Sequence, residues 1–300
     1  PLVVGAACLV FLVLDPYLLL DWPDARAGLA WQWTYSHTGQ YLDVGPAWRY
    51  HLTVSLRYGL GLGLLVLALV GVAWALWRRD AGGILLASFA VPFFLEMSSL
   101  HAVFVRYMTP LVPVLCLFAA SALVGLARRS WTRGTAWLPI TLGVLVLIEP
   151  LHSAVGYDRL VHHKDTRLQV YQFLQTVPGG STAATYGPSV TWRSTLPRWR
   201  PQFYAKNPAE TWGEALDVLR ARGVRYFLIH QSPLDVFSPT IPELEAAIRE
   251  AGTPVGFFSP YRPGAHARPV YDRVDAHFFP VGRFGGLERP GPLVVVYRLN

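Results

Sequence analysis

Charged residues are scarce in this sequence, and their scarcity is uneven along the chain. Of its 300 residues, 15% are charged and 52% are hydrophobic, whereas a soluble domain carries about 25% charged residues. Nearly all the long apolar runs lie in residues 1–156, and residues 157–300 have the composition of an ordinary soluble domain. We therefore expect a polytopic α-helical membrane domain over residues 1–156, followed by a small α/β domain over residues 157–300.

Cysteine is rare, and basic blocks and common catalytic motifs are missing. The two cysteines, Cys8 and Cys116, lie inside apolar runs, which favours small core residues over a disulfide pair. The formal net charge of +7 comes from scattered basic residues without a zinc-finger or RNA-binding signature, so we expect no nucleic-acid partner. There is no GxSxG motif, no Walker loop and no His pair with metal-ligand spacing. The sequence therefore predicts no metal site and no cofactor.

The chain begins with Pro1, inside an apolar run that has neither a charged n-region nor a small-residue cleavage site. Such a start is not a signal peptide. We expect this sequence to be the C-terminal portion of a longer protein.

Several apolar runs are long enough to cross a membrane, which takes about 20 residues. Short arginine-dense loops follow two of them, and such loops stay on the cytoplasmic side. This orientation places residues 15–57, the 96–106 connection and residues 157–300 outside the cytoplasm. The expected spans are a partial one in residues 1–20 and full ones at 58–77, 81–100, 107–127 and 134–155.

The expected outer loop, residues 15–57, is rich in tryptophan. Asp21 precedes Trp22 and Pro23, which predicts a helix start, and Trp22, Leu29 and Trp33 would share one face. A Trp-rich helix beside a span favours an interfacial helix lying on the bilayer; an irregular surface loop is the alternative. Asp21 and Asp24 resemble an acidic pair, but helix capping is the favoured interpretation.

Five ionisable residues fall at the outer ends of the expected spans. Charges at membrane depth are costly and are kept when they are paired or functional, so this group would line an outward cavity; the alternative is that each simply meets water. Arg106 is the strongest candidate, because a guanidinium fork suits a phosphate, although an interfacial arginine also reaches lipid headgroups. The prolines of VFVRYMTPLVPVL would bend the helix there. The five residues are Asp15, Glu96, His101, Arg106 and Glu149.

Four segments, in order, resemble GT-C superfamily membrane glycosyltransferases of the protein mannosyltransferase and aminoarabinose-transferase-like class. VFVRYMTPLVPVL resembles their R-Y-x-x-P-x-x-P segment, and LDPYLLLDWP resembles the exit of a span before the outer interfacial helix. AWRYHLTVSLRYGLGLGLLVLALVGV resembles the entry into the next span, and DTRLQVYQFLQTVPGGS resembles the opening of their exterior domains. The resemblance covers most of residues 10–190.

The resemblance implies sugar transfer from a polyprenyl-phosphate donor to a protein, lipid or glycan acceptor at the outer leaflet. It implies a cell-membrane, multi-pass location among membrane lipids. Arg106 and Tyr107 would bind the donor phosphate, and His101, Glu96 and Glu149 are pocket candidates. The family's catalytic aspartate has no match in residues 1–300, so no catalytic residue is expected in this chain.

Residues 157–300 alternate between helical and strand patterns, which favours a layered α/β sheet. We expect helices at 166–176, 212–221 and 242–251, and strands at 182–186, 224–230, 253–259 and 293–299. The Arg-, Trp- and Pro-rich stretch 191–204 and the Pro- and Gly-rich stretch 253–292 are interpreted as long loops. His230 ends a strand and is interpreted as a satisfied structural histidine; a ligand contact is the alternative. The domain would cover the membrane site or help to hold an acceptor.

A second hypothesis is a non-enzymatic polytopic membrane protein, such as a transporter half or a scaffold with an exterior sensor domain. It predicts polar groups at mid-membrane depth. Their expected place at the outer ends of the spans favours the glycosyltransferase hypothesis.

Overall fold

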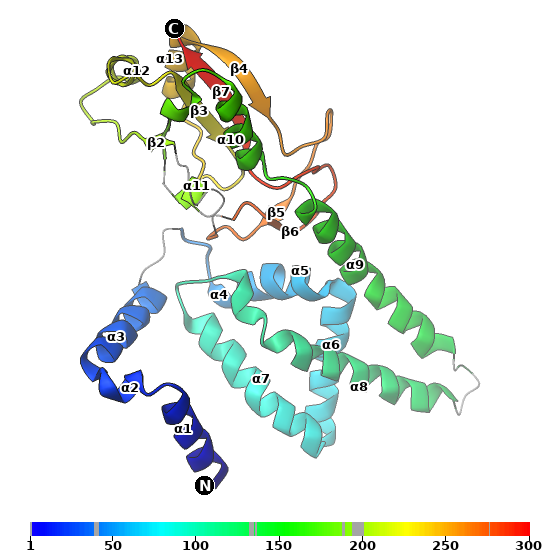
Figure 1. Cartoon of the computed structure of the whole chain (residues 1–300). Helices are drawn as coiled ribbons and strands as arrows, with labels where there is room; N and C mark the ends of the chain where they lie inside the picture. The colour runs from blue at the N-terminus through cyan, green and yellow to red at the C-terminus, as the bar shows by residue number, and fades with distance from the viewer. Residues whose placement is uncertain are drawn as a thin grey trace.

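The computed structural model describes residues 2–38, 42–131, 135, 137–187, 190–193, 201–275 and 277–300 (Figure 1). A helical part comes first and a part built on a five-stranded sheet follows. Within these described residues, three helices are long and apolar enough to cross a membrane, namely α7 (Ala81–Ser99), α8 (Leu111–Trp131) and the helix that begins at Trp137. They suggest membrane association and agree with the predicted helical class.

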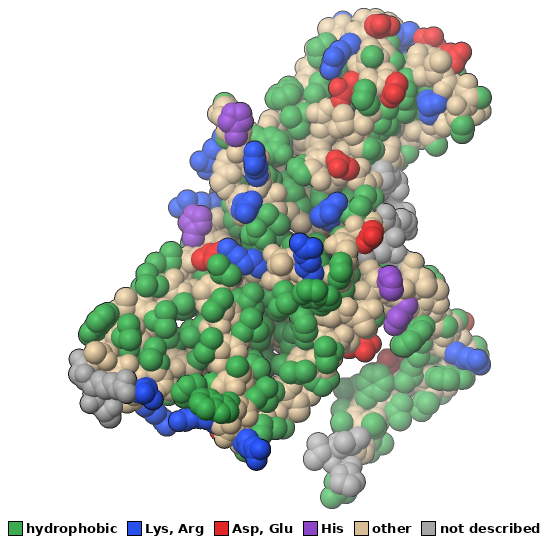
Figure 2. Space-filling view, turned by 180° about the vertical axis from the view of Figure 1, so that it is seen from behind, with side chains coloured by type: hydrophobic (Ala, Val, Ile, Leu, Met, Phe, Trp, Pro, Cys, Tyr) green, Lys and Arg blue, Asp and Glu red, His purple; other side chains and the backbone are tan. Residues whose placement is uncertain are grey.

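The bundle is centred on the crossing of α8 with α6 (Leu62–Arg78) (Figure 1). A Cβ atom added at Gly71 would lie 2.1 Å from the Phe118 carbonyl oxygen, so the two backbones meet with no room for a side chain. Leucines and small residues fill the core, including Leu65, Ala68 and Leu115. From behind, hydrophobic side chains cover the helical part, and charged ones lie at its lower edge and at its junction with the sheet part (Figure 2).

The helix at the second expected span begins later than predicted. Residues 58–77 were expected to form one span, but Gly61 adopts φ +81° and turns the chain by 112° between Leu60 and Leu62. Before the bend the chain forms α4 (Ala47–Tyr50), a π-helix (His51–Ser55) and α5 (Leu56–Leu60). Only glycine adopts this conformation without strain. Residues 50–55, the YHLTVS part of the segment AWRYHLTVSLRYGLGLGLLVLALVGV, therefore lie on a separate helix that runs across the top of the bundle (Figure 1).

The N-terminal helices are α1 (Leu2–Leu14), α2 (Tyr17–Leu20) and α3 (Trp22–Thr38). The prediction that a helix starts near Trp22 is confirmed, with Asp24 in its first turn. The carbonyl of Ser36 accepts hydrogen bonds from the backbone N–H groups of His101 and Ala102, which attaches the end of α3 to the bundle. The side chains of Trp22, Trp31 and Trp33 are exposed, and an interfacial position for α3 stays a prediction.

The last helix of the bundle, α9 (Trp137–Val161), continues past the predicted span end at residue 155 and past the predicted domain boundary at 156/157. It carries the chain directly from the bundle to the sheet part (Figure 1). Gly156 packs under Phe284, since an added Cβ would lie 2.9 Å from that ring.

The sheet has the strand order β2-β1-β3-β7-β4. Strands β1 (Ala183–Thr185), β2 (Gln202–Phe203) and β3 (Tyr226–Gln231) are parallel. Strand β7 (Leu293–Leu299) runs antiparallel to β3 and to β4 (Gly252–Phe258). The expected strands are confirmed to within two residues at each end.

Helices cover both faces of this sheet. One face packs on α10 (Thr166–Thr176), and the other packs on α12 (Trp212–Ala221) and α13 (Pro242–Ala251). All three helices have the predicted bounds. The short helix α11 (Val190–Arg193) lies in the stretch between β1 and β2.

The prediction of long loops is wrong in part. Strand β2 lies in the first predicted loop, and β5 (Val270–Tyr271) and β6 (Pro280–Gly282) pair in the second. Residues 194–200 of the first predicted loop lie outside the described part of the chain. His230 is buried, with its ring nitrogens 2.8 Å from the Ser238 hydroxyl and 3.0 Å from the Tyr186 carbonyl oxygen, so its interpretation as a satisfied structural residue is confirmed.

Candidate functional site: a cavity between the helical and sheet parts

A cavity of about 510 Å³ lies where the helical part meets the sheet part. The 3₁₀ turn Val105–Met108, the end of α5 and the C-terminal half of α9 form one side of it. The other side is formed by residues of the sheet part, namely Asp272, Asp275, His277, Phe279 and Phe284 with Pro280 and Val281 of β6. The polar lining residues are Tyr58, Arg106, Ser153, Tyr157, Asp158, Asp272, Asp275 and His277.

Arg106 is placed at this cavity by the way the chain enters α8. Phe104 is extended, the turn Val105–Met108 follows, and α8 begins only at Leu111. Pro110 and Pro113 therefore lie just before and inside the first helical turn, where no intrahelical N–H bond is lost. The predicted bend within the span is wrong: the prolines define its beginning, and Arg106 lies before the helix.

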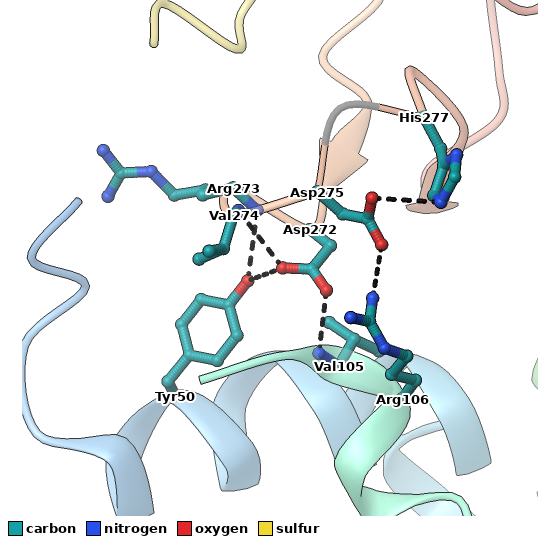
Figure 3. A network of polar contacts seen from close by, with 8 residues as sticks. All are labelled: Tyr50, Val105, Arg106, Asp272, Arg273, Val274, Asp275 and His277. Carbon is teal, nitrogen blue, oxygen red and sulfur yellow. Dashed lines mark hydrogen bonds and ion pairs between the residues drawn. The ribbon is translucent and has the colours of Figure 1, made fainter. Parts of the chain in front are cut away.

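The guanidinium of Arg106 faces a carboxylate across the cavity. Its Nη1 lies 2.7 Å from Asp275 Oδ2, and the other oxygen of Asp275 lies 3.2 Å from His277 Nε2 (Figure 3). The guanidinium also lies over the Phe104 ring, 4.0 Å from its centroid. The Arg106 side chain remains 57% exposed, so the charge is held in place and is still open to solvent.

Asp272 joins the two parts of the molecule beside this ion pair. Its Oδ1 accepts a hydrogen bond from the Tyr50 hydroxyl at 3.1 Å, and its Oδ2 accepts one from the Val105 N–H at 2.8 Å (Figure 3). The Val274 N–H also donates to Oδ1, at 3.3 Å, and the Tyr50 oxygen accepts from the Arg273 N–H. Burial raises the pKa of Asp272, although these donors oppose the effect. We call Asp272 with Tyr50 and Val105 the interdomain clamp.

Of the five residues predicted for the site, the structure brings only Arg106 into the lining of this cavity. Tyr107 packs against Phe104, with ring centroids 5.3 Å apart, and contacts the core beneath. Glu96 and His101 are exposed, and neither lines the cavity.

Glu149 has a different place, at the bend in the chain. Its carboxylate pairs with Arg57 and accepts a hydrogen bond from the Leu62 N–H at 2.8 Å. This N–H is in the first turn of α6, where it has no intrahelical acceptor. Glu149 therefore caps the helix that Gly61 starts, and it does not line the cavity.

Sequence reasoning missed the contribution of the sheet part. Asp272, Asp275 and His277 come from the stretch YDRVDAH, which lies in a Pro- and Gly-rich segment interpreted as a loop. Asp158 and Tyr157 lie on α9 beyond the expected span. The one available signal was the spacing of two aspartates around Val274 in a segment otherwise poor in acids. Within the described residues, no group of three or more His, Cys, Asp and Glu could hold a metal ion.

A second hollow, of about 270 Å³, adjoins the first, and Phe284 lines both. His152, Arg159, His163 and Arg262 surround it. The junction between the two parts is therefore mainly basic on this side, as the band of Lys, Arg and His side chains in Figure 2 also shows.

Comparisons with known proteins place no further constraint on this site, because no family model, no curated protein and no solved structure matches the chain.

Proposed function

We propose that this chain is part of a membrane glycosyltransferase and that the cavity at Arg106 receives the phosphate of a polyprenyl-phosphate-linked sugar. The observation that carries the proposal is the position of Arg106. It lies at the end of a candidate span, it lines a cavity large enough for a sugar phosphate, and its guanidinium remains more than half exposed. In this proposal the chain is a multi-pass protein of the cell membrane, with its sheet part outside the cytoplasm.

The chemistry follows from the charge that develops during transfer. The bond between the sugar C1 and the phosphate oxygen breaks, a bond from C1 to the acceptor oxygen forms, and the acceptor hydroxyl loses its proton to a base. The polyprenyl phosphate leaves with an additional negative charge on its oxygen. A guanidinium held beside that oxygen stabilises the transition state more than the substrate.

The ion pair with Asp275 would keep Arg106 in position while the site is empty. The phosphodiester of the donor carries one negative charge, as a carboxylate does, and its oxygens accept from the guanidinium fork in the same way; the phosphate that leaves carries a second negative charge. The donor would therefore compete with Asp275 for Arg106, and Asp275 would remain paired with His277. The resemblance gives the general base to an aspartate that residues 1–300 do not match, so we assign no base to this chain.

The arrangement of polar groups supports this proposal over a transporter or scaffold. Transporter sites lie near mid-membrane depth. Arg106, Asp158 and Asp275 all lie at the junction with the sheet part, beyond the N-terminal end of α8. The sheet part closes one side of the cavity, as expected for a domain that covers a membrane site.

The proposal is tested by binding of a polyprenyl phosphate to the purified chain in detergent. Arg106→Gln should weaken binding at least about ten-fold, because a hydrogen bond to a charged group contributes about 1.5–3 kcal/mol. Arg49→Gln is the matched control, since Arg49 is exposed on α4 and does not line the cavity. Equal binding by wild type and Arg106→Gln, or equal binding of the uncharged polyprenol, would reject the proposal.

A further inference from the structure

A separate basic hollow lies at the opposite end of the bundle, and the proposed transferase site does not involve it. Beyond the contact of Gly71 with Phe118, helices α6 and α8 diverge (Figure 1). A hollow of about 640 Å³ occupies the angle between their C-terminal halves. Trp74 and Arg78 line it from α6, and Ser121, Gly125 and Arg128 line it from α8.

The hollow concentrates positive charge from two helices. Arg78, Arg128 and Arg129 all line it, and Asp80 is the acidic residue among its described lining residues. Asp80 is already used as the N-cap of α7, where it accepts from the Gly83 N–H at 2.7 Å. In the described part of the chain, no carboxylate forms an ion pair with Arg78 or Arg128. Figure 2 shows the basic side chains at the lower edge of the helical part.

Two further features shape the hollow. The Arg78 guanidinium lies 4.8 Å from the centroid of the Trp74 ring, which restricts where this charge can move. A Cβ atom added at Gly125 would meet no heavy atom within 4 Å, so the missing side chain leaves space between the helices. Ser121 adds a hydroxyl that can donate to an anion.

Apolar surface continues from the hollow along both helices. Val124 on α8 and Val70 on α6 are both about half exposed. A free anion would use only the arginines, whereas a phospholipid would place its headgroup in the hollow and its chains along this surface. Basic pockets between membrane helices at the cytoplasmic side bind the headgroups of anionic lipids.

We propose that the α6–α8 hollow binds the phosphate headgroup of an anionic phospholipid in the leaflet opposite the sheet part. The site is independent of the transferase proposal, because it shares no residue with the cavity at Arg106. Arg78 and Arg128 would contact the headgroup phosphate from two sides, and Gly125 would leave the room for it.

The test uses the full chain in phosphatidylcholine nanodiscs with and without cardiolipin, and measures retained lipid by native mass spectrometry. Cardiolipin should be retained on the wild-type chain in preference to phosphatidylcholine. The double variant R78Q/R128Q should lose about 25-fold in apparent affinity, taking about five-fold for each arginine.

Two further variants separate a built site from general surface charge. Gly125→Leu keeps every charge but places a bulky side chain in the hollow, and it should reduce cardiolipin retention. Arg79→Asn removes one adjacent charge that does not line the hollow, and asparagine tolerates the left-handed conformation that Arg79 adopts, φ +53°. This control should retain cardiolipin.

Other outcomes would overturn the proposal. If inorganic phosphate competed with cardiolipin at equal concentration, the site would be a free-anion site. If Arg79→Asn lost as much lipid as R78Q/R128Q, or if Gly125→Leu lost none, the effect would be general attraction to a basic helix end.

Discussion

The pairing of Arg106 with Asp275 makes an unusual prediction: removing either partner should change phosphate binding, but in opposite directions. Arg106→Gln removes the cation that would hold the donor phosphate. Asp275→Asn removes the carboxylate that lies 2.7 Å from that cation and competes for it. Both substitutions break the same ion pair, so their effects on the fold should be similar.

The two magnitudes differ because the two groups have different roles. Arg106→Gln forfeits hydrogen bonds to a charged ligand, about 1.5–3 kcal/mol, which is about a 10- to 150-fold loss of affinity. An ion pair as exposed as this one is worth only about 0.2–1 kcal/mol in double-mutant cycles. Releasing Arg106 from Asp275, together with the removal of a neighbouring negative charge, should strengthen phosphate binding by about two- to ten-fold.

The assay is titration of the purified full chain with a polyprenyl phosphate in detergent, at two salt concentrations. The gain from Asp275→Asn should shrink at high salt, because the charges involved are partly exposed. Asp217→Asn serves as the control, since it breaks a comparable exposed pair with Arg220 on α12, away from the cavity.

One pattern of results would refute this reasoning. If Arg106→Gln and Asp275→Asn both weakened phosphate binding to the same degree, the ion pair would be a structural contact that holds the sheet part against the helical part. The same result would remove the competition step from the proposed function.

Three further predictions concern the structure around the site. Tyr50→Phe removes one of the donors to the buried Asp272 carboxylate and should lower the free energy of unfolding by about 1–3 kcal/mol. Thermal unfolding measures this loss, and the control Tyr17→Phe, on the exposed helix α2, should show no change. Burial lowers the pKa of His230 to about 4. The neutral His230 ring therefore contributes fully to stability above the unfolded pKa of about 6.5, and about 3 kcal/mol of stability is lost as the pH falls toward 4. Denaturant unfolding across this range should show the loss in wild type and not in His230→Gln. Glu149→Gln should lower the thermal stability of the bundle, because Arg57 loses its ion-pair partner while the Leu62 N–H keeps an uncharged acceptor; a variant as stable as wild type would show that the bend does not need the charge.

The predicted helices of the sheet part agree with the structure because their end signals are local. Asp165 caps α10, Thr211 and Glu214 form a reciprocal capping box at the start of α12, and Pro242 lies in the first turn of α13. Each signal lies within a few residues of the boundary that it sets. The start of strand β7 is similarly bounded, by Pro292 directly before it.

The bend at Gly61 shows where local pattern was insufficient. Residues 58–77 are uncharged and apolar, so hydropathy gives no reason to divide them. The division depends on a positive φ at one glycine and on a carboxylate 87 residues away that accepts the Leu62 N–H. A glycine in a leucine-rich run permits such a turn but does not require it.

The cavity could not be predicted from the sequence, for a related reason. Val105 and Asp272 are 167 residues apart in sequence, and nothing in the local pattern of either links them. The sequence singled out Arg106 on chemical grounds but could not name Asp275 as its partner. It also placed Glu96, His101 and Glu149 together by their common level at the span ends, whereas in the structure none of the three lines the cavity.

The interdomain clamp has a consequence for the order in which the molecule is assembled. Its donors, Tyr50 and the Val105 N–H, are synthesised long before its acceptor, which follows them by 222 and 167 residues. The clamp can therefore close only after the helices and the strands β1 to β4 have been made, while strand β7 is still to follow Asp272. Until residue 272 has been made, Tyr50 and the Val105 N–H lack this acceptor, and nascent chains that stall before it would expose this surface of the helical part to proteases and chaperones.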